Sequence, residues 1–256
     1  MTNDIDDTGE DKQQRVALVT GGARRIGAAI AQRLHREGWR VIIHYRSSGS
    51  EAERLVQGLN NVRSQSAAVL QGDLLAFDSL PRLVAQAGGI FGRLDALVNN
   101  ASTFYPTPIG DIGEPAWADL MGSNLKAPLW LSQAAVPWLR VRRGSIVNIT
   151  DIHADRPLPG YVVYNIAKAG LAAMTRALAV DLAPDIRVNA VAPGSIEWPA
   201  DGQIDPASRE EFLRRIPLAR EGGVAQIAEA VNYLVSDAEY VTGQTINVDG
   251  GRSVAL

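Results

Sequence analysis

The sequence contains no cysteine and only three histidines among its 256 residues. The missing cysteines exclude disulfide bonds, thiolate nucleophiles and zinc sites built from cysteine. None of the histidines, His35, His44 and His153, stands at metal-ligand spacing from another, so no metal site is expected. A net charge of −3 argues against a general nucleic-acid-binding protein.

Long hydrophobic runs are also absent from the sequence. No apolar segment reaches the roughly 20 residues that a membrane-spanning helix needs. Residues 1–14 contain five acids and one lysine, whereas a secretory signal needs a positive start and an apolar run. We therefore interpret residues 1–14 as a flexible acidic tail, and we expect a cytoplasmic protein that binds no membrane.

From residue 15 to the end, short apolar runs alternate with helical patterns and no linker divides the chain. The expected strands are 16–20, 41–45, 67–71, 94–98, 145–149, 186–191 and 245–248. Helical patterns cover 26–37, 117–139, 164–182 and 224–234. Continuous apolar strands that alternate with helices are typical of a parallel sheet. The sequence therefore predicts one α/β domain, a doubly wound seven-stranded sheet with helices on both faces.

Residues 195–215 do not fit this alternation, because they contain Pro199, Pro206 and Trp198 among charged residues. The segment follows the sixth expected strand, at the carboxyl edge of the sheet where ligands bind in such folds. We interpret it as a substrate lid rather than a neutral connection. Trp198 fits a substrate contact and a packing residue equally well.

A glycine-containing turn, Thr20-Gly21-Gly22-Ala23-Arg24-Arg25-Ile26-Gly27, joins the first expected strand to the first helix. Glycines let the backbone approach a pyrophosphate, and the helix amino terminus offers free N–H groups. Placed at the start of a long β/α alternation, the turn predicts a dinucleotide site rather than a plain turn. Arg25 stands where glycine is usual, and its guanidinium could reach the pyrophosphate or a ligand above it.

The second expected strand ends in His44-Tyr45-Arg46-Ser47, without the acid that NAD sites use to bind the ribose diol. An arginine and a hydroxyl suit a 2′-phosphate, so we expect NADPH (and NADP+) rather than NADH; the alternative is a solvated basic turn. Further cofactor contacts are expected where later strands end. They are Asp73, Leu74, Asn100, Ala101 and Ser102.

Tyr164 and Lys168 stand one helical turn apart, with Asp151 thirteen residues before the tyrosine. A neighbouring ammonium is expected to lower the pKa of the Tyr164 phenol, which can then give a proton while the nicotinamide gives a hydride. Lys168 is also expected to bind the nicotinamide ribose. Asp151 adds a second acid/base group; the alternative is a helix cap or loop acid.

These motifs together resemble the short-chain dehydrogenase/reductase family over about residues 15–256. The resemblance implies a single Rossmann domain, a homotetramer, and Asn124 holding a water in a proton relay. It adds Pro193, Gly194 and Ser195 to the cofactor site. In most members of the family, serine stands at the position of Asp151. The matching segments are 20–27, Asp73, 99–101, Asn124, Tyr164, Lys168, 193–194 and 248–251.

Within that family the sequence resembles the pteridine reductases. The resemblance rests on Asp151 in place of serine, on Arg25, on residues 44–47 and on the run 99–108. The resemblance implies a small-molecule pterin substrate that contacts Arg25, Ser102, Phe104, Asp151 and Tyr164. Phe104 would stack on the pterin, with the nicotinamide on the other face. A flat polar heteroaromatic ring also suits an aromatic platform on chemical grounds.

The function expected from the sequence is NADPH-dependent reduction of dihydropterins, such as dihydrobiopterin or dihydromonapterin, and of dihydrofolate, which would place the enzyme in folate metabolism. The alternative within the family is a reductase of 3-oxoacyl or other carbonyl substrates. A non-enzymatic NADP sensor is a third possibility. A sensor has no need of the pair Tyr164 and Lys168, and Asp151 argues against the carbonyl reductase.

Overall fold

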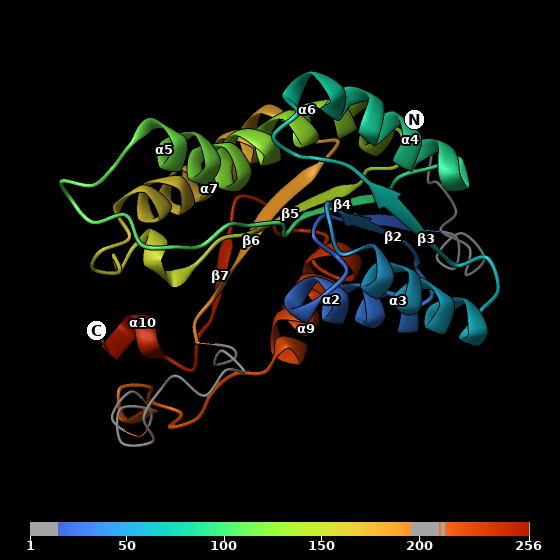
Figure 1. Ribbon diagram of the computed structural model, residues 1–256. Coiled ribbons are helices and arrows are strands. Elements are labelled where there is room, and N and C mark those ends of the chain that lie inside the picture. The colour runs from blue at the N-terminus through green and yellow to red at the C-terminus, as the bar shows by residue number, and fades with distance from the viewer. Residues whose placement is uncertain (1–14, 196–209, 211–212, 256) are drawn as a thin grey trace.

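A seven-stranded parallel sheet forms the centre of the protein (Figure 1). The computed structural model describes residues 15–195, 210 and 213–255. Within them the strand order is β3-β2-β1-β4-β5-β6-β7, so the predicted α/β fold and its seven strands are confirmed. The strands are β1 (Val16–Val19), β2 (Arg40–Tyr45), β3 (Ala67–Gln71), β4 (Ala96–Asn99), β5 (Ser145–Ile149), β6 (Arg187–Pro193) and β7 (Thr245–Val248).

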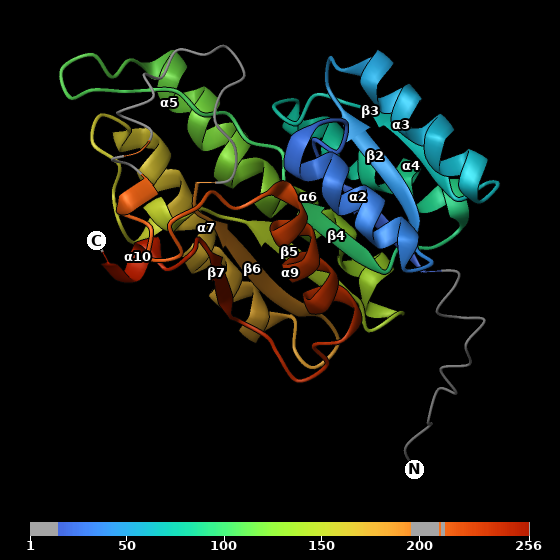
Figure 2. The same cartoon turned by 90° about the horizontal axis from the view of Figure 1, so that it is seen from below.

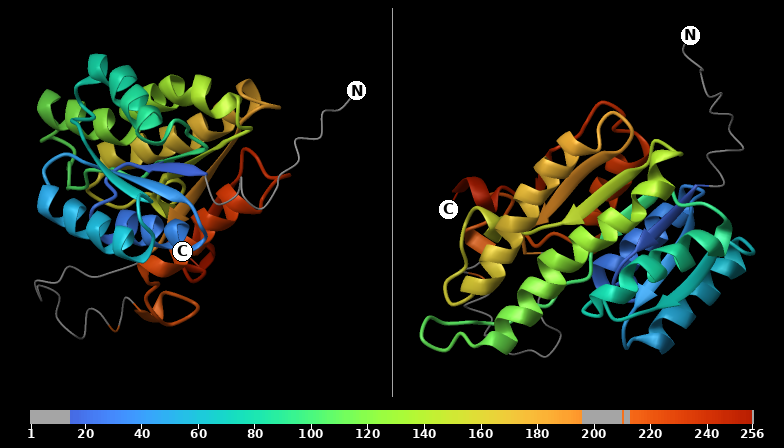
Figure 3. Two further views of the ribbon diagram at one scale, coloured as in Figure 1. Left: turned by 90° about the vertical axis from the view of Figure 1, so that its right-hand side faces the viewer. Right: turned by 90° about the horizontal axis from the view of Figure 1, so that it is seen from above.

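Helices cover both faces of the sheet, as Figures 1 and 3 show. One face carries α2 (Arg25–Arg36), α3 (Gly49–Val62) and α9 (Val224–Ser236). The other carries α4 (Leu80–Phe91), α5 (Glu114–Met121), α6 (Ala127–Arg140) and α7 (Val162–Asp181). The short helices are η1 (Phe77–Ser79), η3 (Ile152–Ala154) and the carboxyl-terminal α10 (Arg252–Ala255). No helix among the described residues is long and apolar enough to cross a membrane.

The central strands β1, β4 and β5 are largely apolar, because both of their faces are buried. In β1, Val16 and Leu18 belong to the hydrophobic cluster under α4 and α6, while Ala17 and Val19 belong to the cluster under α2 and α9. All four side chains are fully buried. The continuous apolar runs of the sequence therefore reflect two cores, one on each side of the sheet.

The chain crosses the sheet in two directions from β1, toward β2 on one side and toward β4 on the other. In an open parallel sheet this reversal leaves a crevice outside the carboxyl ends of the strands. The loops after β1, β2, β4, β5 and β6 all end at this edge, so the fold itself gathers them around one site.

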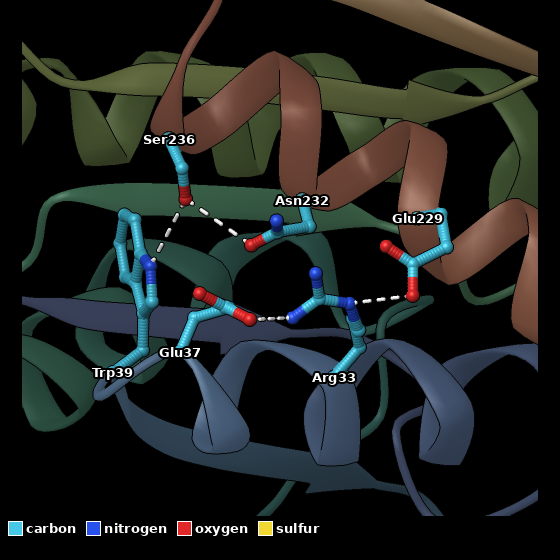
Figure 4. Close-up of polar contacts among 6 residues, drawn as sticks. All are labelled: Arg33, Glu37, Trp39, Glu229, Asn232 and Ser236. Atoms are coloured by element: carbon cyan, nitrogen blue, oxygen red, sulfur yellow. Dashed lines mark hydrogen bonds and ion pairs between the residues drawn. The ribbon is translucent and has the colours of Figure 1, made fainter.

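A polar clasp ties the first helix of the domain to the last long one (Figure 4). Arg33 of α2 donates from Nε to Glu229 of α9 at 2.6 Å, and its guanidinium also pairs with Glu37. Trp39 donates from its indole nitrogen to Ser236 at 3.3 Å. Figure 2 shows α2 and α9 lying alongside each other in front of the sheet. The helix that begins at the glycine turn is therefore packed against the carboxyl-terminal part of the domain.

One expected helix differs from the structure, and one expected segment is not tested by it. The helix expected over 117–139 is a longer segment, α5 followed by a π-helical turn (Gly122–Lys126) and α6. A single 3.6-residue periodicity cannot reveal the wider turn. The segment 195–215, expected as a lid, lies mostly outside the described residues, as do Trp198 and the acidic tail.

Candidate active site

A cavity of about 820 Å³ opens at the carboxyl edge of the sheet. Side chains from the glycine turn, the ends of β2 to β6 and the start of α7 line it. The structure thus brings together nearly all of the residues that the sequence analysis selected. These lining residues are Gly21, Arg25, Ile26, Gly27, His44, Tyr45, Arg46, Ser47, Asp73, Leu74, Asn100, Ala101, Ser102, Phe104, Asp151, Tyr164, Lys168, Pro193, Gly194 and Ser195.

The glycine turn has a backbone that a ligand can approach closely. Gly21 has a φ of +59°, and a Cβ on Gly27 would lie 2.3 Å from the carbonyl oxygen of Gly21. The Thr20 hydroxyl accepts the backbone N–H of Asn100 at 2.9 Å, and the Asn100 amide donates to Thr20 O at 2.8 Å. The turn is therefore fixed to the end of β4, with the amino terminus of α2 at the cavity. This cradle fits the pyrophosphate of a dinucleotide.

His44 binds the backbone of this turn. Its Nδ1 accepts the N–H of Gly21 at 3.2 Å, and its Nε2 lies 3.2 Å from the carbonyl oxygen of Gly72, to which it donates as the neutral tautomer. Burial lowers the pKa of His44 to about 4, so the ring is neutral at physiological pH. Both ring nitrogens bind backbone groups, so His44 positions the glycine turn. The expected direct contact of His44 with the cofactor stays a prediction.

Cationic and hydroxyl groups stand where β2 ends. Arg46 and Ser47 are exposed at the cavity, and Arg24 of the glycine turn lines the same cavity. Arg24 was not selected from the sequence, and it lies 3.7 Å from Glu51 in α3. The end of β2 itself carries no acid, so this corner of the cavity can accept a negatively charged group.

Asp151 and Tyr164 are joined directly. The Tyr164 hydroxyl donates to Asp151 Oδ2 at 2.7 Å, and Asp151 Oδ1 accepts the N–H of His153 at 2.9 Å, which caps η3. Burial, and then the charge and hydrogen bond of Asp151, raise the pKa of the Tyr164 phenol well above its ordinary value. The expectation that Lys168 lowers this pKa is therefore wrong: the phenol is held protonated, as a proton donor.

Lys168 lies one turn along α7 and is almost completely buried. Its ammonium donates to the carbonyl oxygen of Ile149 at 2.9 Å and sits 5.6 Å from the centre of the Tyr164 ring. Burial lowers the pKa of Lys168 to about 8, and the attraction of Asp151 opposes that shift. The ammonium is anchored at the end of β5, where the backbone fixes its position.

Asn124 occupies the π-helical turn behind the cavity wall rather than the wall itself. Its amide donates to Leu120 O at 2.9 Å and to Thr103 O at 3.0 Å, and its Oδ1 accepts the Ser102 hydroxyl. Ser102 therefore stands between Asn124 and the cavity. The proton relay through a water on Asn124 stays a prediction; the geometry shows Asn124 fixing the loop that carries Ser102.

Two aromatic rings form one side of the cavity. Phe104 is 54% exposed, lies parallel to Tyr161 with ring centres 4.6 Å apart, and meets Tyr164 edge-on at 4.8 Å. The loop is held by the Thr107 N–H, which donates to Gly160 O at 2.7 Å. Tyr161, the residue directly before α7, was not selected from the sequence. Arg252 also lines the cavity and was missed, because its position near the carboxyl terminus gave no local signal.

A dinucleotide cradle and an acid/base tyrosine in one cavity, at the switch point of a doubly wound sheet, define a Rossmann-type oxidoreductase. The comparisons give the family. A family model described as enoyl-(acyl carrier protein) reductase matches residues 21–253. The chain belongs to the short-chain dehydrogenase/reductase family, whose members use nicotinamide dinucleotides.

Relatives of two activities match at similar identity. Pteridine reductase 1 of Leishmania tarentolae is 38% identical, covering 93% of this chain and 96% of the relative. The 3-oxoacyl-[acyl-carrier-protein] reductase FabG of Staphylococcus aureus is 37% identical, covering 94% and 98%. A putative ketoacyl reductase of granaticin polyketide synthesis in Streptomyces violaceoruber is also 37% identical, covering 92% and 95%. The substrate must therefore be argued from the site.

Proposed function

We propose that the protein is an NADPH-dependent pteridine reductase that converts dihydropterins to tetrahydropterins. The observation that carries this proposal is the hydrogen bond of 2.7 Å between Tyr164 and the Asp151 carboxylate inside the cavity. The exposed ring of Phe104, on the same wall, offers a flat surface to a heteroaromatic substrate.

The negative charge of Asp151 distinguishes reduction of a ring C=N bond from reduction of a ketone. Reduction of a ketone places negative charge on the substrate oxygen beside the phenol, and a carboxylate at hydrogen-bond distance from that phenol repels it. Reduction of a ring C=N bond instead ends with a proton on nitrogen. A carboxylate favours the protonated nitrogen, and Asp151 with Tyr164 can supply or relay that proton.

Each residue then has a stated task. When bound, NADPH supplies the hydride to the ring carbon. Tyr164, held protonated by burial and by Asp151, gives a proton to the adjacent ring nitrogen, and Asp151 orients the phenol through its hydrogen bond. The phenolate that results takes up one proton from solvent water before the next turnover. Lys168 holds a positive charge at the end of β5, where it would bind a ribose hydroxyl of the cofactor. Phe104 and Ser102 would fix the substrate plane.

The preference for NADPH rests on the end of β2. Arg46 and Ser47 are exposed at the cavity there, and the strand end has no acid for a ribose diol. A 2′-phosphate supplies the negative charge that this corner accepts. Michaelis constants for the two nucleotides decide the point, and a clear preference for NADH would exclude this part of the proposal.

The central test is Asp151→Ser, assayed by NADPH oxidation with dihydrobiopterin. Because the variant loses the second proton-transfer group, we expect kcat/KM to fall about 100-fold. Asp155→Ser is the matched control, since Asp155 is exposed four residues away and does not line the cavity. Full activity of Asp151→Ser on dihydrobiopterin would contradict the role of the carboxylate.

Carbonyl reduction is the second candidate, because the 3-oxoacyl reductases match this chain nearly as well. The wild-type protein is therefore assayed in parallel with dihydrobiopterin, dihydromonapterin, dihydrofolate and acetoacetyl thioesters. We expect turnover of the pterins. Activity on the thioesters alone would replace the proposed function with the carbonyl reductase.

A further inference from the structure

A single residue, Thr107, joins the loop that follows β4 to the start of α7. Thr107 is 3% exposed, and its N–H donates to the carbonyl oxygen of Gly160 at 2.7 Å. Its hydroxyl accepts the N–H of Val163 at 3.1 Å, across 56 positions of the sequence. An isolated parallel bridge pairs Thr107 with Tyr161, which lies between these two partners. We call Thr107 and residues 160–163 the loop clamp.

The loop clamp supplies a cap that α7 lacks on its own. The residue before the helix, Tyr161, makes no side-chain capping bond, and the first N–H groups of a helix have no partner within it. The Thr107 hydroxyl provides a partner for the N–H of Val163, although a capping threonine usually stands directly before the helix. The first turn of α7, which carries Tyr164, is therefore fixed by the loop that carries Phe104.

The aromatic rings of the cavity lie on the two segments that the loop clamp joins. Phe104 stacks on Tyr161 with ring centres 4.6 Å apart and an angle of 15° between the planes, and it meets Tyr164 edge-on at 4.8 Å. Tyr161 covers one face of Phe104, and the ring, 54% exposed, keeps its other face for a flat ligand. Thr107 itself does not line the cavity, whereas the three rings do.

We propose that Thr107 and Tyr161 are positioning residues, which set the place of a substrate ring on Phe104 relative to the Tyr164 phenol. This inference rests on the proposed function and deepens it, because hydride and proton must reach adjacent atoms of one ring. The hydrogen bonds of the loop clamp fix the separation of loop and helix, and the Tyr161 ring supports Phe104 on the face turned away from the ligand. A displacement of about 1 Å at such a site can cost on the order of 100-fold in rate.

The first test is Thr107→Val, assayed with dihydrobiopterin and NADPH. The variant keeps the shape of the side chain and removes the acceptor of the Val163 N–H, so this bond no longer ties the start of α7 to the loop. We expect kcat to fall about tenfold, while KM for NADPH changes less than about twofold because the glycine turn lies outside the loop clamp. Thr107→Ser keeps the hydroxyl and should restore most of the lost kcat.

Thr242→Val is the matched control, because it removes a bond of the same kind. The Thr242 hydroxyl accepts the N–H of Val188 at 3.1 Å, and Thr242 does not line the cavity. Both valine variants should lower the midpoint of urea denaturation, whereas only Thr107→Val should lower kcat. An equal fall of kcat in the two variants, or a Thr107→Ser variant as slow as Thr107→Val, would overturn the role of Thr107.

A second pair of variants tests the ring and leaves the hydrogen bonds of the loop clamp in place. Tyr161→Leu removes the ring that supports Phe104, and Tyr161→Phe keeps it. We expect Tyr161→Leu to raise the dissociation constant of dihydrobiopterin about fivefold, and Tyr161→Phe to leave it unchanged. Equilibrium dialysis on protein saturated with NADP+ measures this constant without turnover. This pair also decides the inference if Thr107→Val does not fold.

Binding and turnover separate this inference from the proposed function. If the wild-type protein binds dihydrobiopterin without reducing it, the pteridine reductase proposal fails, and the dissociation constants of the Tyr161 variants still decide the role of the ring. If the wild-type protein reduces dihydrobiopterin, and Tyr161→Leu and Thr107→Val match it in dissociation constant and in kcat, the proposed function stands and the positioning role is overturned. A wild-type protein that does not bind dihydrobiopterin would overturn both.

Discussion

Two polar clusters share strand β5 and helix α7, and they do different things. The interior cluster consists of Asn99, Ser132, Asn148 and Thr175. The cavity cluster consists of Asp151, Tyr164 and Lys168. Strand β5 and the residues directly after it supply Asn148 and Asp151, and α7 supplies Thr175, Tyr164 and Lys168.

The interior cluster is neutral and bonded mainly to itself. Asn99 donates to Asn148 at 2.8 Å, Asn148 donates to Thr175 at 2.9 Å, and all three side chains are buried. The cavity cluster is charged. Among the described residues its Lys168 ammonium donates to one acceptor, Ile149 O, out of the three bonds that an ammonium can make.

The comparison shows that the place of a polar residue along the strand decides its role. Polar residues at the middle of β5 stabilise the fold, and those at its carboxyl end are available for the reaction. Tyr164, Lys168 and Thr175 lie on one face of α7, at spacings of four and seven residues. Thr175 meets the middle of β5, where it accepts the bond that the buried Asn148 amide donates. Tyr164 and Lys168 lie beyond the strand end, where bonding capacity is kept for a ligand.

The largest effect should come from Lys168→Met. We expect kcat/KM to fall by about 100- to 1000-fold, because the fixed positive charge at the end of β5 is lost. Lys126→Met is the matched control: this lysine packs on Phe77 and Trp130, outside the cavity. Equal losses in the two variants would show that the charge of Lys168 has no special role.

The pH dependence of kcat/KM also tests the need for a charged Lys168. The pKa of Lys168 is lowered to about 8, so the ammonium that the site needs is present below pH 8, and kcat/KM should fall as the pH rises through about 8. Because Asp151 raises this pKa, Asp151→Ser should move the alkaline limb to lower pH. A profile that stays flat to pH 9.5 would contradict the assignment.

A middle-sized effect is expected from Thr175→Val in the interior cluster. The variant keeps the shape but removes the acceptor of Asn148, so the free energy of unfolding should fall by about 1–3 kcal/mol, with kcat changed less than twofold. Urea denaturation and steady-state kinetics measure the two quantities. Thr245→Val, at an exposed position of β7, is the control. A fall in kcat at unchanged stability would break the comparison.

The smallest effect is expected from Ser132→Ala. Its hydroxyl accepts from Asn99 at 3.3 Å and donates to Pro128 O within α6, while Asn99 keeps its shorter bond to Asn148. We therefore expect a loss of less than about 1 kcal/mol in the free energy of unfolding, again by urea denaturation. A larger loss than in Thr175→Val would mean that Ser132 is the centre of the cluster.

The sheet could be predicted because its strands are continuous apolar runs between helical patterns. The run 94–98 was expected as a strand, whereas the structure has β4 from Ala96 to Asn99. Asp95, just before it, still bonds both neighbouring strands through its backbone, and its carboxylate also accepts the N–H of Val16 at 2.8 Å. The π-helical turn at Asn124 and the short α10 were not foreseen, since neither has a periodicity of its own.

The site could be predicted in part because Asp151, Tyr164 and Lys168 stand at a recognisable spacing. The pKa direction of Tyr164 could not, since burial and the side-chain contact with Asp151 set it. Arg252 was missed for the same kind of reason. Its place in the cavity depends on α10, which is held locally by the Ser253 N–H that Asp249 accepts and at long range by Arg156, which donates to Ser253 O across 97 positions.

The clasp between α2 and α9 has a consequence for how the protein is made. Its bond from Arg33 to Glu229 joins residues 196 positions apart. At a synthesis rate of about 5–20 residues per second, the helix that follows the glycine turn leaves the ribosome roughly 10–40 s before its partner. During that interval the part of α2 that packs against α9 is uncovered, so the nascent chain exposes apolar surface there until residues 224–236 have been made.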